Sequence, residues 1–580
     1  MRPDGKTEGL RQSNAWLHTW TGLPLGWLLY AVFFTGTLSY FLDEVNVWMK
    51  PELHRSVPAA DPVATAEVGI NALTRLAPDA TTWTLVMPGA RQVAIEASWR
   101  EPGAAQGRAG LKRAELDAAT GEPIATRQTR GGSFLYRFHF ELHAMPRIWG
   151  RWIVGIATGL MFVAILSGVI THRKIFSDFF TFRPNKGQRS WLDAHNATAV
   201  LALPFHVMIT FSGLLLLMIM LMPWGLEAAY QGDTRAYATE RRALGAGGGG
   251  GGGQPAAQGP QGGGARGPAA LAPLAPMMAE AMARWPRDGV GTIVVNNPGT
   301  RRATVELREQ TGHRLTDRGA IARLVFDGVT GTLREAPEPP RPTATTATYN
   351  VLTAPHLGRF AGPGFRWLLF LAGVFGTVMV ATGLLLWVAK RMPERRKRGR
   401  TPFGHRLVEV LNLGTIGGLS VATAGYFWLN RLIPAEQIRR SDLEIQGFFV
   451  IWGVCLLHAA IRGSSRGWRE QLAVAAILFA ALPVLNPLTG GAGLHETLVR
   501  AQWPIAGFDL AMLALAIVHA AALFVLVRRA APAPRRKFAA DRAARAPKGS
   551  EPPAIDAAKD RQLGGAVALD SPRMPKRDSH

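Results

Sequence analysis

The chain has 580 residues, 48% of them hydrophobic, and a formal net charge of +24 at pH 7. The apolar residues form long blocks, which excludes an ordinary soluble globular protein, and a single cysteine, Cys455, excludes disulfides and cysteine-based zinc or iron–sulfur sites. Lys and Arg gather in every second loop between the blocks, which favours a membrane protein with positive inside loops over a nucleic-acid-binding protein.

Eight apolar blocks are long enough, at roughly 17–25 residues, to cross a bilayer as helices. The sequence therefore predicts a polytopic α-helical membrane protein with about eight transmembrane helices and both termini in the cytoplasm. The first block leads into Asp43-Glu44 rather than a cleavage site, which predicts a retained anchor. Pro483 and Pro487 make the seventh block the weakest. The blocks are 16–42, 150–171, 196–222, 365–389, 408–430, 445–461, 470–487 and 505–527.

The two long segments between blocks one and two and between blocks three and four are not apolar enough to insert into a bilayer. Each combines a helical pattern with strand-like runs, which predicts an α+β fold. In the first, a helix is expected at 63–76 and strands at 81–86, 92–99 and 111–116. In the second, a helix is expected at 271–285 and strands at 292–295, 303–307 and 322–326.

The predicted organisation follows from these elements. A low-complexity stretch at 243–270 contains an unbroken run of glycines, which predicts a flexible linker, and the tail is rich in Ala, Pro and charge, which predicts disorder. The parts are the N-terminus and helix 1 (1–42), outer domain 1 (43–145), helices 2 and 3 (146–222), outer domain 2 with the linker (223–364), helix 4 (365–390), a C-terminal four-helix region (391–530) and a cytoplasmic tail (531–580).

The first half of the chain contains an internal repeat. His18 precedes Thr35-Gly36 by the same interval as His195 precedes Ser212-Gly213, and both runs open with Trp-Leu. The return helices match in the same way, and two turns of the outer segments recur at one constant offset. This indicates two copies of one unit within residues 1–390, related by an axis along the membrane normal. The further matches are Arg151-Trp152 and Ser167-Gly168 with Arg366-Trp367 and Thr382-Gly383, and Pro88-Gly89 with Pro298-Gly299.

These motifs carry a family resemblance. Trp-Leu-His-x-Trp-x-Gly opens a helix that ends in Thr-Gly, and Asp-x-x-Thr-Gly occurs at 117–121 and 327–331. With these motifs in this order, residues 14–390 resemble the PepSY-associated transmembrane helix family. The resemblance implies two PepSY-like periplasmic domains, an inner-membrane location and, as in family members that reduce ferric siderophores, haem between the helices. The last four helices lie outside it.

Haem iron in a membrane bundle requires two imidazoles that face each other from different helices at equal depth. His18 and His195 meet this requirement at the cytoplasmic ends of two outward helices. His143 and His356 precede the two return helices and are candidates for a second, periplasm-facing haem b, with His139, one turn earlier, as a replacement for His143. The alternative is that these are interfacial or loop histidines without a cofactor.

Further histidines are weaker candidates. His172 ends the second block and either binds the inner haem or caps the helix C-terminus. His206 lies about 16 Å into the third block at ~1.5 Å per residue, and an intramembrane histidine indicates function, although a hydrogen bond to a neighbouring helix would also account for it. His458 and His519 are more typical of structural histidines than of a quinone or cofactor site.

The expected function is a membrane oxidoreductase of the ferric-siderophore-reductase type. Electrons from a cytoplasmic or quinol donor would reduce a ferric siderophore or other periplasmic iron chelate and release Fe(II). Lipid is the expected surrounding, and no nucleic-acid partner is expected. Two alternatives remain: a non-enzymatic sensor or peptide-binding protein that uses its outer domains, and a transporter with histidine proton relays. The sequence has no GxGxxG after a strand, no P-loop and no His-Glu-x-x-His motif.

Overall fold

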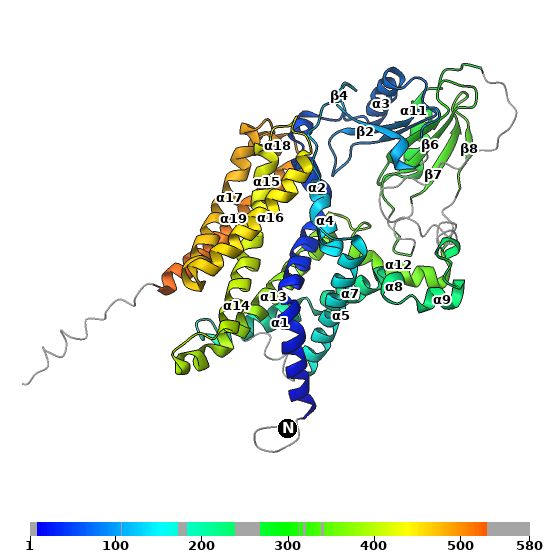
Figure 1. The fold of residues 1–580 in the computed structure, drawn as a ribbon. Coiled ribbons are helices and arrows are strands. Elements are labelled where there is room, and N and C mark those ends of the chain that lie inside the picture. The colour runs from blue at the N-terminus through cyan, green and yellow to red at the C-terminus, as the bar shows by residue number, and fades with distance from the viewer. Residues whose placement is uncertain are drawn as a thin grey trace, which may run out of the picture. The chain divides into compact units, whose positions relative to one another are not determined.

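The structure is a computed structural model, and it describes residues 9–105, 107–171, 182–237, 267–312, 314–316, 321–337 and 341–530 (Figure 1). The predicted tail at 531–580, most of the predicted linker at 243–270 and the candidate His172 lie outside the described residues.

In the described part, seven helices are long and apolar enough to cross a membrane, or up to eight if one bent pair counts as a single span. The prediction of a multi-pass membrane protein is therefore confirmed. The bent pair corresponds to the predicted block at 196–222: α6 (Gln188–Leu201) meets α7 (Leu203–Leu216) at an angle of 69°. Pro204, in the first turn of α7, has no N–H to continue α6, which explains a break at this place.

Shorter helices join the remaining spans of the repeated half. The helix α1 continues through a 3₁₀ turn, η1 (Ser39–Phe41), into α2, so the first span reaches Trp48. The helices are α1 (Leu10–Leu38), α2 (Leu42–Trp48), η2 (Pro51–Arg55), α4 (Gly132–Glu141), α5 (Arg147–Thr171), α8 (Met218–Leu221), α9 (Trp224–Tyr230), α12 (Ala344–Leu357) and α13 (Pro363–Arg398).

The C-terminal region is a bundle of four long spans. Its first span, Phe403–Leu432, is interrupted by a π-helical turn rich in glycine. The predicted weak block at 470–487 is a full helix that contains both Pro483 and Pro487. The elements are α14 (Phe403–Asn412), η4 (Leu413–Gly417), α15 (Gly418–Leu432), α16 (Arg440–Arg462), α17 (Ser464–Leu488), α18 (Leu494–Val499) and α19 (Trp503–Ala530).

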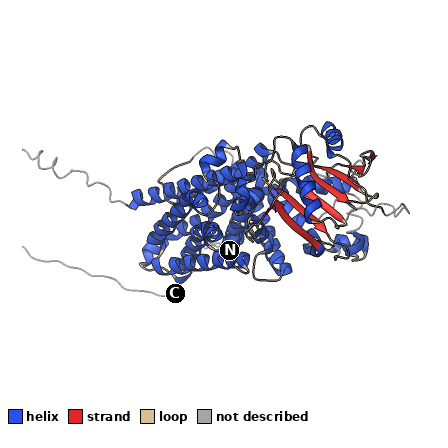
Figure 2. Cartoon of the chain, turned by 90° about the horizontal axis from the view of Figure 1, so that it is seen from above, coloured by secondary structure: helices blue, strands red, loops and turns tan. Residues whose placement is uncertain are grey.

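The strands of both outer segments form one antiparallel sheet, with the order β4-β3-β2-β1-β5-β6-β7-β8 (Figure 2). The two halves meet where β1 pairs with β5, from Thr82 opposite Asn296 to Val86 opposite Thr292. α3 (Pro62–Leu76) and α11 (Leu274–Arg284) share one hydrophobic core with the strands. The strands are β1 (Thr82–Val86), β2 (Ile95–Arg100), β3 (Leu111–Leu116), β4 (Pro123–Ile124), β5 (Val290–Asn296), β6 (Thr304–Glu309), β7 (Arg323–Asp327) and β8 (Leu333–Glu335).

The same turn closes each half of the sheet. The Asp117 carboxylate accepts hydrogen bonds from the N–H groups of Ala119 and Thr120, and the Asp327 carboxylate does the same for the residues at 329 and 330. Both turns end at a glycine with φ of 73°, Gly121 and Gly331, a backbone conformation that favours glycine. The two outer segments, which the sequence predicts as two domains, thus have matching turns, and their strands form one sheet.

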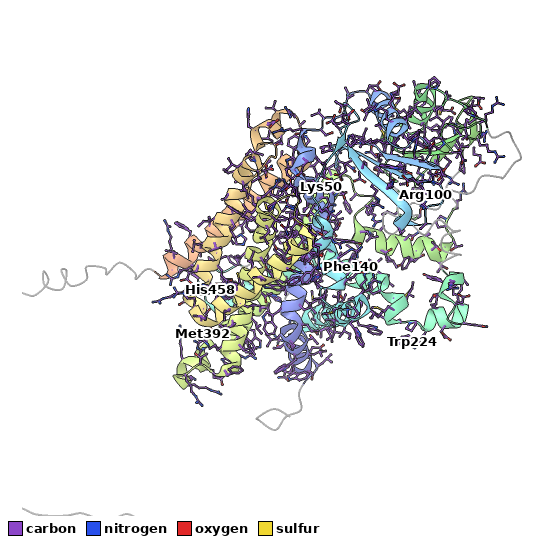
Figure 3. All side chains as sticks on the ribbon, turned by 45° about the horizontal axis from the view of Figure 1, so that its top comes forward. Lys50, Arg100, Phe140, Trp224, Met392 and His458 are labelled. Carbon is purple, nitrogen blue, oxygen red and sulfur yellow. The ribbon has the colours of Figure 1, made fainter. Side chains whose placement is uncertain are left out.

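Ionic contacts connect the sheet to the end of the first span. Lys50, labelled in Figure 3, follows α2 and forms an ion pair with Glu115 of β3. Arg91, in the loop before β2, forms ion pairs with Asp43 and with Glu44 of α2, at 2.9 and 2.7 Å. Both contacts lie near the open end of the β2–β3 hairpin, where Glu96 pairs with Glu115, so they attach this end of the sheet to α2.

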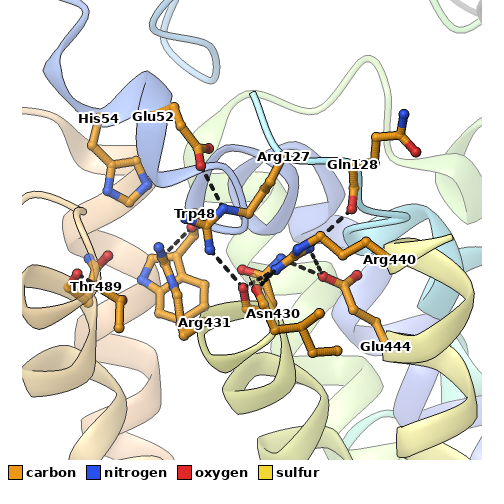
Figure 4. A network of polar contacts seen from close by, with 12 residues as sticks. Trp48, Glu52, His54, Arg127, Gln128, Asn430, Arg431, Arg440, Glu444 and Thr489 are labelled. Carbon is orange, nitrogen blue, oxygen red and sulfur yellow. Dashed lines mark hydrogen bonds and ion pairs between the residues drawn. The ribbon is translucent and has the colours of Figure 1, made fainter. Parts of the chain in front are cut away.

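A buried polar network joins the repeated half to the C-terminal bundle (Figure 4). Arg440 of α16 is fully buried, forms an ion pair with Glu444 and donates to the Gln128 carbonyl at 3.1 Å. Arg127 donates to Glu52 and to the Asn430 carbonyl of α15, at 2.7 and 2.8 Å. Arg127 and Arg440 thus each form an ion pair with a carboxylate. Their further bonds to backbone carbonyls join segments that are some 300 positions apart in the chain.

A second link lies deeper in the bundle. The Trp27 indole N–H of α1 donates to the Asn412 side chain at 2.9 Å, and the Asn412 amide donates to the Leu384 carbonyl of α13 at 3.1 Å. Asn412 directly precedes the π-helical turn η4. The C-terminal bundle is therefore attached to α1, the first helix of the first copy, and to α13, the last helix of the second copy.

We expect Arg440→Met to lower the free energy of unfolding by about 3–5 kcal/mol, because it leaves the buried Glu444 carboxylate without its cation. Thermal or chemical unfolding of the full-length protein in detergent measures this. The double variant Arg440→Met/Glu444→Leu should recover much of the loss. Arg439→Met, which removes a neighbouring but exposed charge, should change stability by less than about 0.5 kcal/mol; a loss equal to that of Arg440→Met would contradict the role given to the network.

Candidate functional site: two histidine pairs between the helices

The first pair is formed by His18 of α1 and His195 of α6. Their ring centres are 6.2 Å apart, and the ring planes are inclined by 67°. The two histidines occupy equivalent places in the two copies of the repeat, since each opens an apolar run. The structure therefore brings together the two residues that the repeat spacing had matched.

The second pair is formed by His139 of α4 and His356 of α12, whose ring centres are also 6.2 Å apart, with planes inclined by 51°. His143 does not take part in it: its ring stacks on Phe449 of α16 at 5.1 Å. The residue that faces His356 is therefore His139, which the sequence offered as a replacement for His143. α4 ends at Glu141, so His139 is held by a helix whereas His143 lies beyond it.

Each of the four rings is oriented by a hydrogen bond from its Nδ1 to another helix. In His18 and His195 the acceptors are the carbonyl oxygens of Ala164 and Met379, at 2.8 and 2.9 Å. His139 uses the Val32 carbonyl at 2.7 Å. Because a carbonyl can only accept, Nδ1 carries the proton in these three rings and Nε2 carries the lone pair.

The fourth ring reaches the same state through a hydroxyl group. His356 Nδ1 lies 2.9 Å from Ser212 Oγ of α7. The Ser212 hydroxyl lies 2.5 Å from the Met208 carbonyl, which can only accept, so this bond uses its single proton. Its oxygen therefore accepts from His356, and Nε2 is again the nitrogen with the lone pair, as required of a metal ligand whose other nitrogen is held by a second group.

Every ring also lies against a glycine of the repeat. A Cβ atom added to Gly168 or Gly383 would stand 3.2 Å from the Cε1 atom of His18 or His195. The corresponding distances for the second pair are 2.5 Å from Gly36 to His139 and 3.3 Å from Gly213 to His356. The small-residue pairs of the sequence are therefore the surfaces on which the imidazoles rest, besides any role in helix packing.

The spacing within each pair suits one iron atom with an imidazole on either side. With metal–nitrogen bonds of about 2 Å, two such rings have centres roughly 6 Å apart. The observed separation is 6.2 Å in both pairs. The donor set, two imidazoles of one tautomer from different helices, also suits haem. Because His18 and Gly36, the glycine on which His139 rests, are 18 residues apart on α1, the pairs are about 27 Å apart along this helix at ~1.5 Å per residue.

The first pair lies in a cavity of about 300 Å³ between α1, α5, α6, α7 and α13. Apolar and small side chains form most of its wall, and Gly22 and Gly26 of α1 keep that wall shallow. His206 lines the same cavity, whereas Lys390 and Arg391 line it where α13 approaches its end. A partly enclosed, largely apolar space between helices is the kind of site in which a planar apolar group can bind.

His206 is the least satisfied polar side chain of the cavity. It is 1% exposed, and neither ring nitrogen has a hydrogen bond of standard geometry to a described residue, although the Ala199 backbone of α6 lies near enough to interact with the ring. Its ring lies edge-on to Phe33 of α1, with centres 6.2 Å apart, and Nε2 would be 3.2 Å from a Cβ on Gly376 of α13. The hydrogen bond to a neighbouring helix that the sequence offered as an alternative is therefore at most a weak contact with the Ala199 backbone of α6.

Other candidate histidines lie away from both pairs. His458 of α16 contacts Glu470 at 2.8 Å and Gln471 at 3.2 Å, and His519 of α19 bonds to the carbonyl of Leu515 in its own helix at 2.8 Å. Both have protein partners typical of structural histidines. His54, which the sequence analysis did not single out, is fully buried between Val47 and Ala492, and its burial lowers its pKa to about 3.

Positive charge gathers near the second pair. Glu141, the last residue of α4, is 7% exposed and lies within ion-pair distance of Arg137, Arg147 and Arg151. One carboxylate thus faces three guanidinium groups, which leaves a local excess of positive charge two residues from His139. Such an excess attracts anions from solution. The cluster could have been found from the sequence only if α4 had been recognised as a helix.

A family model described as "PepSY-associated TM region" matches residues 15–390, which confirms the family expected from the repeated motifs. The match ends where the C-terminal bundle begins, and it covers all four histidines of the two pairs. No curated protein matches the chain.

We expect Gly36→Ala to destabilise the protein by about 1–3 kcal/mol, because the added methyl group would overlap the His139 ring. Gly159→Ala provides the control, since no atom lies within 4 Å of the position its Cβ would take. This control should be neutral or stabilising by up to about 1 kcal/mol through helix propensity. Thermal unfolding in detergent compares them, and equal midpoints would show that His139 does not rest on this glycine.

We expect His206→Leu to leave the stability of ligand-free protein unchanged or to raise it by about 1–3 kcal/mol, because a buried polar group without a hydrogen bond of standard geometry is removed. His54→Leu is the matched comparison: it should destabilise by a similar amount, because Ala492 N–H and the Val47 carbonyl lose their partner. Unfolding by denaturant measures both. A comparable loss for His206→Leu would mean that this ring forms a full hydrogen bond after all.

Proposed function

Because the chain belongs to the family of PepSY-associated TM regions, we propose that it is a haem-containing electron-transfer protein of the bacterial inner membrane. Its substrate is a ferric chelate, such as a ferric siderophore, on the periplasmic side. The strongest support comes from the two histidine pairs. Their four imidazoles come from two copies of a repeat and have the same tautomer, and the ring centres are 6.2 Å apart within each pair.

The first pair would hold one haem b and the second pair another. When bound, haem supplies a carrier of single electrons. The protein determines the orientation of the histidine ligands. The carbonyl and hydroxyl oxygens that accept the Nδ1–H bonds orient each ring and increase the basicity of Nε2. The glycines let the rings approach a neighbouring helix, and the apolar walls of the cavity around His18 and His195 exclude water.

The positions of the two pairs suit transfer across a bilayer. The basic loops indicate that His18 and His195 lie on the cytoplasmic side, where a soluble reductant or a quinol is the electron donor. The second pair, about 27 Å away along α1 at ~1.5 Å per residue, is then on the periplasmic side, close to the roughly 30 Å hydrocarbon thickness. In this proposal, the repeated half of the chain carries electrons from one face of the membrane to the other.

The substrate follows from the chemistry of the second pair's surroundings. Oxygen chelators bind Fe(III) much more tightly than Fe(II), so transfer of one electron to the chelated ferric ion reduces it to Fe(II) and releases it. No protein nucleophile or general base is needed. Such chelates commonly carry negative charge, and the excess of arginines around Glu141 attracts anions to the face on which His139 lies.

We expect purified full-length protein to give a reduced-minus-oxidised visible difference spectrum of haem with two imidazole ligands. His18→Ala should remove one part of the signal and His139→Ala the other, and the two together should remove nearly all of it. His143→Ala is the control and should retain both parts, because its ring stacks on Phe449 instead of facing His356.

The haem-to-protein ratio of the same samples gives the number of sites, with two expected. A featureless spectrum from protein made with ample haem would reject the proposal. It would leave the sensor and transporter interpretations of the sequence. Loss of signal in His143→Ala but not in His139→Ala would reject the assignment of the second pair while retaining the cofactor.

A further inference from the structure

The cavity around the first pair has an unusual charge distribution. Its wall includes two cations, Lys390 and Arg391 on consecutive positions of α13, and no aspartate or glutamate among the residues described. The rest of the wall toward His206 and Leu29 is apolar apart from histidines, threonines and one asparagine. A ligand that fills this cavity can therefore carry negative charge only at the edge that faces the end of α13.

The two cations differ from Arg395 and Arg398 of the same helix end. Arg395 pairs with Glu409 at 2.7 Å, and Arg398 pairs with Glu394 at 2.6 Å. Lys390 and Arg391, in contrast, have no carboxylate within ion-pair distance in the described part of the chain. Both cations that line the cavity therefore lack an ion pair among the described residues, although carboxylates pair with arginines nearby.

Arg391 is also held in place without being neutralised. Its guanidinium lies 3.8 Å from the centre of the Trp387 ring and donates to the Trp387 carbonyl at 3.3 Å. Stacking on an aromatic ring and a backbone bond orient the fork of N–H donors while leaving further donors for a carboxylate. An arginine that only extends from a helix end into the lipid headgroups does not need to be oriented by two such contacts.

We propose that Lys390 and Arg391 bind the two propionate carboxylates of the haem held by His18 and His195, so that the cavity selects a porphyrin dicarboxylate with its charged edge toward the end of α13. This inference rests on the proposed function and adds the orientation of the macrocycle and a second requirement for its binding. The charged edge lies toward the cytoplasmic side, and the uncharged edge lies toward His206 and Phe33.

The test compares ferric protoporphyrin IX with its dimethyl ester, which has the same ring and iron but no negative charge. Full-length protein with His356→Ala, which leaves the first pair intact, is purified from haem-starved cells, and binding is followed by the absorption of the porphyrin. The diacid should bind at least about 10-fold more tightly than the diester, or about 1.4 kcal/mol. In Lys390→Gln/Arg391→Gln the preference should fall to about twofold or less through weaker binding of the diacid alone.

Arg396→Gln/Lys397→Gln is the control, because it removes the same charge from the same helix end at positions that do not line the cavity. It should keep the preference, and Lys390→Arg/Arg391→Lys should restore most of it. Equal binding of diacid and diester by the parent protein would overturn the inference and leave the haem proposal intact. So would an equal loss of preference in the control. Binding of neither porphyrin would overturn the proposed function itself.

Discussion

The structure depends on one repeated contact: an imidazole that rests on a glycine of another helix and donates its Nδ1 proton to an oxygen of that helix. The contact occurs at Gly36, Gly168, Gly213 and Gly383. It requires close approach of the helices, because a methyl group in place of the glycine hydrogen would overlap or crowd the ring. It also selects the tautomer, so a single packing arrangement determines both the position of each ring and the nitrogen it can offer to a metal.

The same contact explains why the unit is duplicated. Each histidine rests on a glycine of its own copy, but each pair takes one ring from each copy: His18 with His195, and His139 with His356. The sheet follows the same rule, because its central pairing joins β1 of one copy to β5 of the other. Neither the pairs nor the joined sheet would exist in one copy alone. The proposed electron path is thus a property of the interface between the copies.

The C-terminal bundle lies outside the family match, yet it is attached to the same helices. Burying the ion pair of Arg440 and Glu444 has a desolvation cost that a hydrophobic pair would avoid, so its contribution is one of specificity rather than of net stability. It establishes which segment of the first copy the bundle contacts. Asn412 adds a contact to α1 and α13, which both line the cavity of the first pair. The bundle therefore supports the helices that carry the proposed haem without contributing a lining residue to that cavity.

The sequence alone determined the membrane class, most of the spans and strands, the repeat and the family, because hydrophobic periodicity and motif spacing are local properties. It also predicted that His18 and His195 belong together, since equal intervals place them at equivalent positions of the two copies. It ranked His143 above His139, because the choice depends on where α4 ends and how it packs on α1, and no local pattern carries that information. The joining of β1 to β5, the poorly satisfied nitrogens of His206 and the cations at the cavity were likewise decided only by tertiary structure. Each depends on which surfaces meet after the helices have packed, which spacing along the chain does not specify.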